Sequence, residues 1–177
     1  QGSNLELHYN DQYIRLRADE NQSSGYPLSL DIHEFSLGTL SAIAIGQSQL
    51  ISGTINADFR LQSQEPLAME GQARIDSFTL IGKTVGNLSS SIRQSPESGM
   101  DFQVGIDQFG NNTQVKGNYQ SSESKLDMTV NMHPLNLSPF GFLLGEFVDS
   151  FSGGLVGDLR IQKMKDDLEL TGNVGLD

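Results

Sequence analysis

The sequence predicts a mainly β fold, a curved antiparallel meander that forms an elongated, taco-like β-groove with two short amphipathic helices. Three observations lead to this prediction. Apolar and polar residues alternate along much of the chain, turn-forming residues separate the alternating segments, and a unit of about 100 residues occurs twice. A period of two indicates strands with one apolar face and one polar face that contacts water.

The alternation is clearest after Gly53, where apolar residues at 55, 57, 59 and 61 are separated by polar ones. Because successive side chains of a strand point to opposite faces, we expect the apolar ones to share one interior. That interior should be lined by Leu28, Leu30, Ile32, Ile55, Ala57, Phe59, Leu61, Leu67, Met69, Ile75, Phe102, Val104, Ile106, Leu126, Met128, Val130, Met132, Leu155, Leu159 and Ile161. The charged residues Asp58, Arg60, Asp158 and Arg160 should face water and form cross-strand ion pairs.

Short connections such as Asn10-Asp11 separate the strands. They imply antiparallel pairing, because parallel strands need crossovers of roughly a dozen residues or more. At Asp76 and Ser77 the apolar phase changes, from Ile75 to Phe78. This change predicts a β-bulge or a bend.

Two segments depart from the period of two. Residues 139–151 are expected to form an amphipathic helix, with Ser138 as N-cap and Pro139 at the first helical position. The apolar residues of this helix recur at helical spacing, namely Phe140, Leu143, Leu144, Phe147, Val148 and Phe151. A weaker counterpart is expected over residues 38–49, with Leu40, Ile43 and Ala44 on one face. The helices should cover the opening or a seam of the groove.

The repeat becomes visible when residues 52–62 are aligned with residues 152–162, where five positions are identical. With one extra residue, the match continues from residues 67–76 onto residues 168–177. We therefore expect a first repeat over residues 4–100 and a second, truncated repeat over residues 101–177, as part of a longer array. Residues 1–3 are interpreted as the remnant of an expression tag.

Composition excludes several functions. The chain has 11 Lys and Arg residues against 22 Asp and Glu residues, a formal net charge of −11, so nucleic acid is not an expected partner. Cysteine is absent, which excludes disulfides and thiolate chemistry. No apolar run approaches the roughly 18 residues of a membrane span, and the first residues do not have a basic segment followed by an apolar one, so we expect these residues to contain neither a membrane span nor an export signal.

No residue pattern predicts catalysis or a cofactor. His33 and His133 are equivalent in the repeat, but the acidic neighbours Asp31 and Glu34 of the first are replaced in the second copy, which disfavours a metal site. Asp166, Asp167 and Glu169 lack the spacing of a calcium loop and predict a solvated turn. We expect neither an enzyme nor a metal protein.

The apolar face allows two structures. It closes into an ordinary sandwich core, or it stays partly open as an apolar groove. Small residues on this face, such as Gly71, Ala73 and Gly117, favour a curved sheet with a narrow lumen, but they do not decide between the two.

The order of motifs resembles the TamB family of bacterial envelope proteins, which are related to AsmA. The resemblance lies in Leu135 to Phe140, an amphipathic stretch, Ser152 to Ile161, and Leu168 to Val174. It extends to residues 52–76 of the first repeat, where Gly38-Thr39 replaces Ser138-Pro139. It implies a periplasmic section of a protein that is anchored in the inner membrane and acts in outer-membrane biogenesis.

The resemblance and the apolar face together lead to a leading hypothesis. The chain would be a non-enzymatic groove that shields phospholipid acyl chains during transport between inner and outer membrane, with the listed interior residues as its lipid groove. Further expected partners are neighbouring repeats and an outer-membrane β-barrel assembly factor. Two alternatives stay open. One is a scaffold that assists assembly of outer-membrane β-barrel proteins by strand pairing, and the other is a structural repeat of a surface protein.

Overall fold

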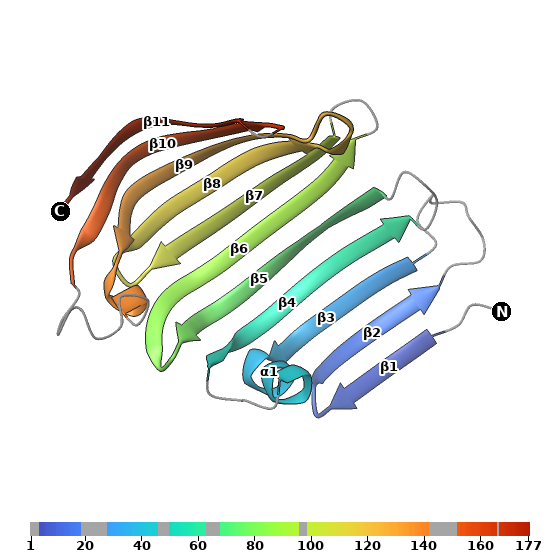
Figure 1. Ribbon diagram of the computed structural model, residues 1–177. Coiled ribbons are helices and arrows are strands. Elements are labelled where there is room, and N and C mark those ends of the chain that lie inside the picture. The colour runs from blue at the N-terminus through green and yellow to red at the C-terminus, as the bar shows by residue number, and fades with distance from the viewer. Residues whose placement is uncertain are drawn as a thin grey trace.

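The computed structural model describes residues 4–18, 28–45, 50–62, 68–95, 99–141, 152–165 and 167–177. Within these ranges the chain is almost entirely β, as the sequence predicts. Eleven strands form one antiparallel sheet in which every strand pairs with its neighbours in the sequence (Figure 1). The strands are β1 Asn4–Tyr9, β2 Gln12–Ala18, β3 Leu28–Ser36, β4 Ile51–Gln62, β5 Ala68–Leu80, β6 Lys83–Ser95, β7 Gly99–Gln108, β8 Asn111–Gln120, β9 Lys125–Asn136, β10 Gly154–Met164 and β11 Asp167–Leu176.

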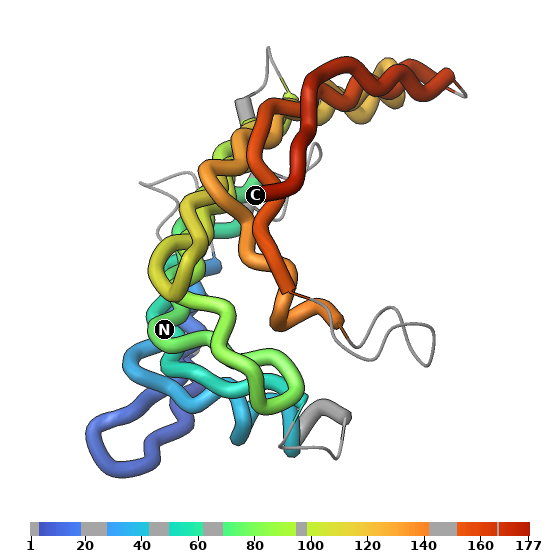
Figure 2. Tube along the Cα trace, turned by 90° about the vertical axis from the view of Figure 1, so that its left-hand side faces the viewer, coloured from blue at the N-terminus to red at the C-terminus, as the bar shows by residue number. Residues whose placement is uncertain are grey.

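The sheet is an open, curved surface. The trace bows from β1 to β11, with its concave side on the right of Figure 2. β1 and β11 are the first and last strands of the order, so the described strands do not close into a barrel. With a spacing of roughly 4.8 Å between strands, the sheet extends about 50 Å across its strands.

The first predicted helix is present. α1 runs over Leu37–Ile45 and begins one residue before the predicted range. It packs on β3 and β4 on the concave side of the sheet (Figures 1 and 2). Leu37 and Ser41 are buried, whereas Thr39 and Ala42 are exposed, so the helix turns one side toward the sheet. Residues 46–49 of the prediction lie outside the described residues.

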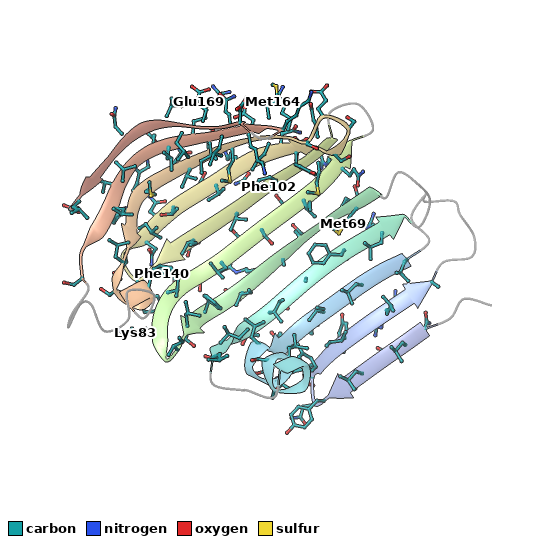
Figure 3. The ribbon with its side chains drawn as sticks, viewed as in Figure 1. Met69, Lys83, Phe102, Phe140, Met164 and Glu169 are labelled. Atoms are coloured by element: carbon teal, nitrogen blue, oxygen red, sulfur yellow. The ribbon has the colours of Figure 1, made fainter. Side chains whose placement is uncertain are left out.

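The second predicted helix falls largely outside the described part of the chain. Residues 138–141 form a 3-10 turn, and residues 142–151 are outside the described ranges. The turn lies at the same rim of the sheet as α1, with Phe140 near the start of β6 (Figure 3). The Nζ of Lys83 donates a hydrogen bond to the carbonyl oxygen of Ser138 at 3.2 Å, which ties the turn to β6. A further 3-10 turn, η1, spans Ser121–Glu123 between β8 and β9.

The bulge predicted at Asp76 and Ser77 is confirmed. The register between β4 and β5 shifts between Ser52 and Thr54, because β5 contains an extra residue there. Ser77 has a positive φ of 53°, and its N–H donates to Oδ1 of the buried Asn87 at 3.0 Å. Because of this extra residue, the apolar residues before the bulge and those after it point to the same face of the sheet.

The two repeats have the same strand pairing. Phe35 of β3 pairs with Ile55 of β4, and Leu135 of β9 pairs with Leu155 of β10. The register shifts just beyond each pair, at positions 100 residues apart. The division at residues 100 and 101 stays a prediction, because the sheet continues across it.

The buried core is small and lies at the rim that carries α1 and the 138–141 turn. Phe35, Leu37 and Ala57 are buried near α1, and Val85 and Met132 are buried farther along the sheet. No second sheet covers the concave face in the described part of the chain, which contains one sheet. Of the two alternatives that the sequence left open, the described residues form the open sheet. Among them, no helix has the length and apolar character needed to cross a bilayer.

Candidate functional site

The candidate site is the apolar concave face. The strand register places the described members of the predicted set on one face of the sheet, since strand pairing connects them directly or through residues of β6 and β8, which contribute no member to the set. Met69 and Phe102 point toward the viewer from this face (Figure 3). Leu67 lies outside the described residues. A one-residue slip would have exchanged the two faces, so the register is what creates the site.

Two rows of cross-strand neighbours run along this face through all eleven strands. The first row consists of Leu5, Leu16, Leu30, Phe59, Gly71, Ile92, Phe102, Gly117, Met128, Ile161 and Leu170. The second row consists of Leu7, Ile14, Ile32, Ala57, Ala73, Ser90, Val104, Val115, Val130, Leu159 and Gly172. Ser90 is the one polar member of the two rows. The site is therefore an apolar track about 50 Å long.

The track is partly accessible to solvent along its length. Most of its members in the central strands are neither buried nor fully exposed. At the ends the exposure rises, to 71% for Leu5 and 58% for Leu170. Contiguous apolar surface on a protein commonly marks a contact site for apolar partners, which makes this track the candidate site.

Two glycines of the track leave the space beside them to the aromatic rings of neighbouring strands. The ring of Phe59 lies against Gly71 on the next strand, where an added Cβ would collide with the ring and with the carbonyl oxygen of Asp58. The ring of Phe102 lies against Gly117 in the same way. Each ring thus lies down along the sheet instead of standing up from it. The glycines keep the track low where an aromatic residue would otherwise obstruct it.

The opposite face is polar and carries ion pairs. Asp58, Arg60, Asp158 and Arg160 are all exposed there, as the sequence predicts. Arg160 donates to both carboxylate oxygens of Asp127 on β9, at 3.0 and 2.7 Å. This guanidinium holds the pKa of the Asp127 carboxyl below its ordinary value.

Arg60, the counterpart of Arg160 in the first repeat, makes longer contacts on the polar face. Arg60 lies 3.6 Å from Glu70 on β5 and 3.9 Å from Asp58 on its own strand. Nearer the first edge, Glu6 accepts hydrogen bonds from Arg15, which lowers the pKa of the Glu6 carboxyl. These pairs are exposed, so they stabilise the sheet weakly and keep its outer face hydrated.

Two open hollows, of about 670 and 570 Å³, lie over the central strands and are lined mainly by polar-face residues. Residues common to both hollows are Asp58, Gln72, Ser91 and Gln103. Their linings mix acidic, basic and neutral side chains. This mixture does not select one ligand class, so the hollows add no chemistry to the apolar track.

The histidines are exposed on the polar face. The ring of His33 lies 5.2 Å from that of Tyr13 on the neighbouring strand, and the Nε2 of His133 lies 3.8 Å from Asp158. In the ranges that the structure describes, no group of three His, Asp or Glu side chains is placed to hold a metal ion.

Sequence reasoning missed several residues of the track. β6 was not recognised as a strand, because its serines and its asparagine obscure the apolar residues Leu88 and Ile92. The signal was available, since Leu88, Ser90 and Ile92 alternate with Ser89, Ser91 and Arg93. The outer strands β1, β2 and β11 also contribute to both rows, although none of their residues was placed in the site.

Fold and site together define an open antiparallel β-sheet with an apolar track on its concave face, over which the described ranges place no second sheet. No family model matches this chain, and comparisons with curated proteins and with solved structures find no significant match.

Proposed function

We propose that this chain is a section of a TamB-like periplasmic protein, in which the apolar track shields phospholipid acyl chains during their transport between the inner and outer membranes. The observation that carries the proposal is the continuity of the two apolar rows across eleven strands with no second sheet over them in the described residues. The proposal requires no catalytic residue and no cofactor.

The energetics favour acyl chains as occupants. Transferring a methylene group from water to an apolar surface is worth about 0.8 kcal/mol when burial is complete. An acyl chain with a dozen or more methylene groups would therefore gain several kcal/mol even on an open face that covers it partly. No specific polar contact is needed to hold it.

The uniformity of the track supports movement along it. Every strand except β6, where Ser90 stands in the second row, presents a pair of apolar residues, so most neighbouring positions offer an acyl chain an apolar contact. The rings of Phe59 and Phe102 lie against glycines and do not rise as barriers. A shallow, repeated energy profile allows an occupant to slide, whereas a closed pocket with directional hydrogen bonds would hold it in place.

Site-specific photocrosslinking tests the proposal. A photoreactive amino acid is placed at Phe59 or Leu159 on the track and, as matched controls, at Arg60 or Arg160, the adjacent residues on the opposite face. We expect phospholipid adducts, identified by mass spectrometry, at the two track positions only. Adducts at all four positions would indicate nonspecific labelling, and none at the track positions would contradict the proposal.

A charge on the track provides a second test. Phe59→Glu should reduce lipid adducts at Leu159 while leaving the melting temperature close to that of Arg60→Glu, because a carboxylate on an open face stays hydrated. If the face were a closed core, the same carboxylate would be buried without a partner and the protein would unfold. Failure of Phe59→Glu to fold, with Arg60→Glu stable, would thus exclude an open groove.

A further inference from the structure

Two hairpin turns of the sheet expose a large apolar residue at their ends. Ile81 and Gly82 connect β5 to β6, and Phe109 and Gly110 connect β7 to β8. Ile81 is 47% exposed and Phe109 is 57% exposed, and we call these two side chains the apolar tips. Both turns lie at the rim of the sheet that carries α1 (Figure 1). A Cβ added at Gly82 would meet no atom of the described residues within 4 Å, so none of them covers this turn.

The backbone of the two turns is unfavourable for the residues that occupy it. Ile81 has a φ of 50° and Phe109 a φ of 48°, in the left-handed region. This position of a hairpin turn is ordinarily Asn, Asp or Gly, and a β-branched or bulky residue there is a genuine outlier. The β1–β2 turn follows the ordinary preference, with Asn10 at a φ of 55°. The apolar tips therefore stand where a polar residue would be more stable, which indicates a role in binding.

The apolar tips are held on rigid bases. The buried Asn111, next to the β7–β8 turn, donates through Nδ2 to the carbonyl oxygen of Val85 on β6 at 2.5 Å. Its Oδ1 accepts from the N–H of Asn136 at the end of β9, at 2.6 Å. In the other turn, the N–H of Ile81 donates to the carbonyl oxygen of Leu50 at 2.8 Å. Little ordering is then needed when the tips bind, which favours binding even through a small contact.

The charges around the apolar tips suit an anionic lipid surface. Residues 79–83 and 108–112 contain one charged side chain, Lys83, although the chain as a whole has a net charge of −11. Lys83 lies at the start of β6, beside the turn (Figure 3). A phospholipid surface with anionic headgroups attracts a lysine and repels carboxylates. The two turns thus combine an apolar end with the absence of negative charge in these residues.

A protein partner fits the apolar tips less well than a bilayer does. A stable protein interface buries roughly 800 Å² on each partner. The tips belong to hairpins whose mutual pairing ends at Asn87 and Asp107, so the described residues place them as two separate projections. A bilayer needs no complementary shape, because each apolar side chain gains free energy on leaving water whatever its neighbours are.

We propose that Ile81 and Phe109 insert as apolar wedges into the surface of a phospholipid bilayer and dock the α1 rim of the sheet on it. The inference goes beyond the proposed function and does not depend on it, because neither tip belongs to the two rows of the track. Insertion of two side chains gives weak and reversible binding, which should require roughly millimolar lipid.

Vesicle flotation tests the proposal. Vesicles of phosphatidylethanolamine and phosphatidylglycerol should bind the wild type, and Ile81→Asn or Phe109→Asn should each lower the partition coefficient about tenfold, since each removes one large apolar side chain. Both variants should melt at the wild-type temperature or above it, because asparagine favours the left-handed conformation. Unchanged partitioning of both variants would overturn the proposal.

The matched control returns an apolar residue at the opposite rim. Ser124, at the end of η1, has a φ of 49° and is exposed. Ser124→Leu, added to Ile81→Asn, should not restore binding, because its side chain is at the other end of the strands. Restored binding would show that any exposed apolar residue suffices and would contradict docking by the α1 rim.

Fluorescence locates the inserted residue directly. The chain contains no tryptophan, so Phe109→Trp is a single reporter. Its emission should shift to shorter wavelength when vesicles are added, whereas that of Ser124→Trp should not change. A shift at both positions would indicate nonspecific adsorption, and no shift at Phe109→Trp would exclude its insertion, so either result overturns the proposal.

Two further results would assign the apolar tips to another occupant and overturn the proposal. A lower melting temperature of Ile81→Asn and Phe109→Asn would show that the tips pack against the chain itself. A wild-type dimer in analytical ultracentrifugation that Ile81→Asn dissociates would assign them to a second copy. The acyl-chain proposal is tested separately, since lipid adducts at Phe59 do not require the tips.

Discussion

The two repeats contain the same bulge but stabilise it differently. In the first repeat, the N–H of Glu34 donates to Oδ1 of Asn56 on the neighbouring strand at 3.0 Å. One hundred residues later, Pro134 replaces Glu34 and Val156 replaces Asn56. Proline has no N–H to satisfy, and valine offers no acceptor. Donor and acceptor have therefore been removed together, and the register shift is retained without them.

Packing differs more than pairing between the repeats. Phe35, beneath α1, is 2% exposed, whereas its counterpart Leu135 is only half-buried. The strand that follows differs as well, since β5 lies between two strands and β11 is exposed throughout. The comparison teaches that alternation fixes the pairing of strands, whereas burial depends on what lies over and beside them.

The largest expected difference between the repeats is in core packing. Phe35→Ala should lower the free energy of unfolding by about 3–5 kcal/mol, since it deletes a fully buried ring. Leu135→Ala should cost about half as much or less, because its side chain is partly exposed. Urea unfolding of the two variants measures the difference. Equal losses would show that the counterpart positions are packed alike, contrary to the structure.

The bulge contact gives a smaller expected effect. Asn56→Val removes the acceptor for the Glu34 N–H and should destabilise the protein by about 1 kcal/mol, because water can replace part of the contact at this exposed position. Val156→Asn should change stability little, since Pro134 has no donor for the new side chain. Thermal unfolding compares the two. A larger loss in Val156→Asn than in Asn56→Val would refute the explanation given for the paired replacement.

The smallest expected effect concerns the ion pairs of the polar face and depends on pH. Because Arg160 lowers the pKa of Asp127 in the folded state, the pair stabilises the protein at pH values above the ordinary carboxyl value of 3.8. This contribution is lost as the pH falls through and below that value. The change should be small, since the two side chains are 34% and 54% exposed.

Melting temperatures at pH 7 and pH 3 check this expectation. Asp127→Asn should reduce the difference between the two temperatures relative to the wild type. If Asp127→Asn left the difference unchanged, the hydrogen bonds from Arg160 would add nothing to stability over this pH range.

The sequence by itself determined the class of fold, the faces of the strands and the repeat. These features rest on local rules, since the side chains of a strand alternate whatever surrounds it. The change of phase at Asp76 and Ser77 predicted the bulge that the structure contains. β6 was missed because its serine-rich sequence weakens the alternation, although Leu88 and Ile92 occupy their expected face.

Only the tertiary structure decided that the described strands form one open sheet. An apolar face has the same pattern whether it meets a second sheet, closes on itself or stays uncovered, so Phe59 and Leu159 could equally have belonged to a sandwich core. The pairing of β1 through β11 in sequence order settled this point.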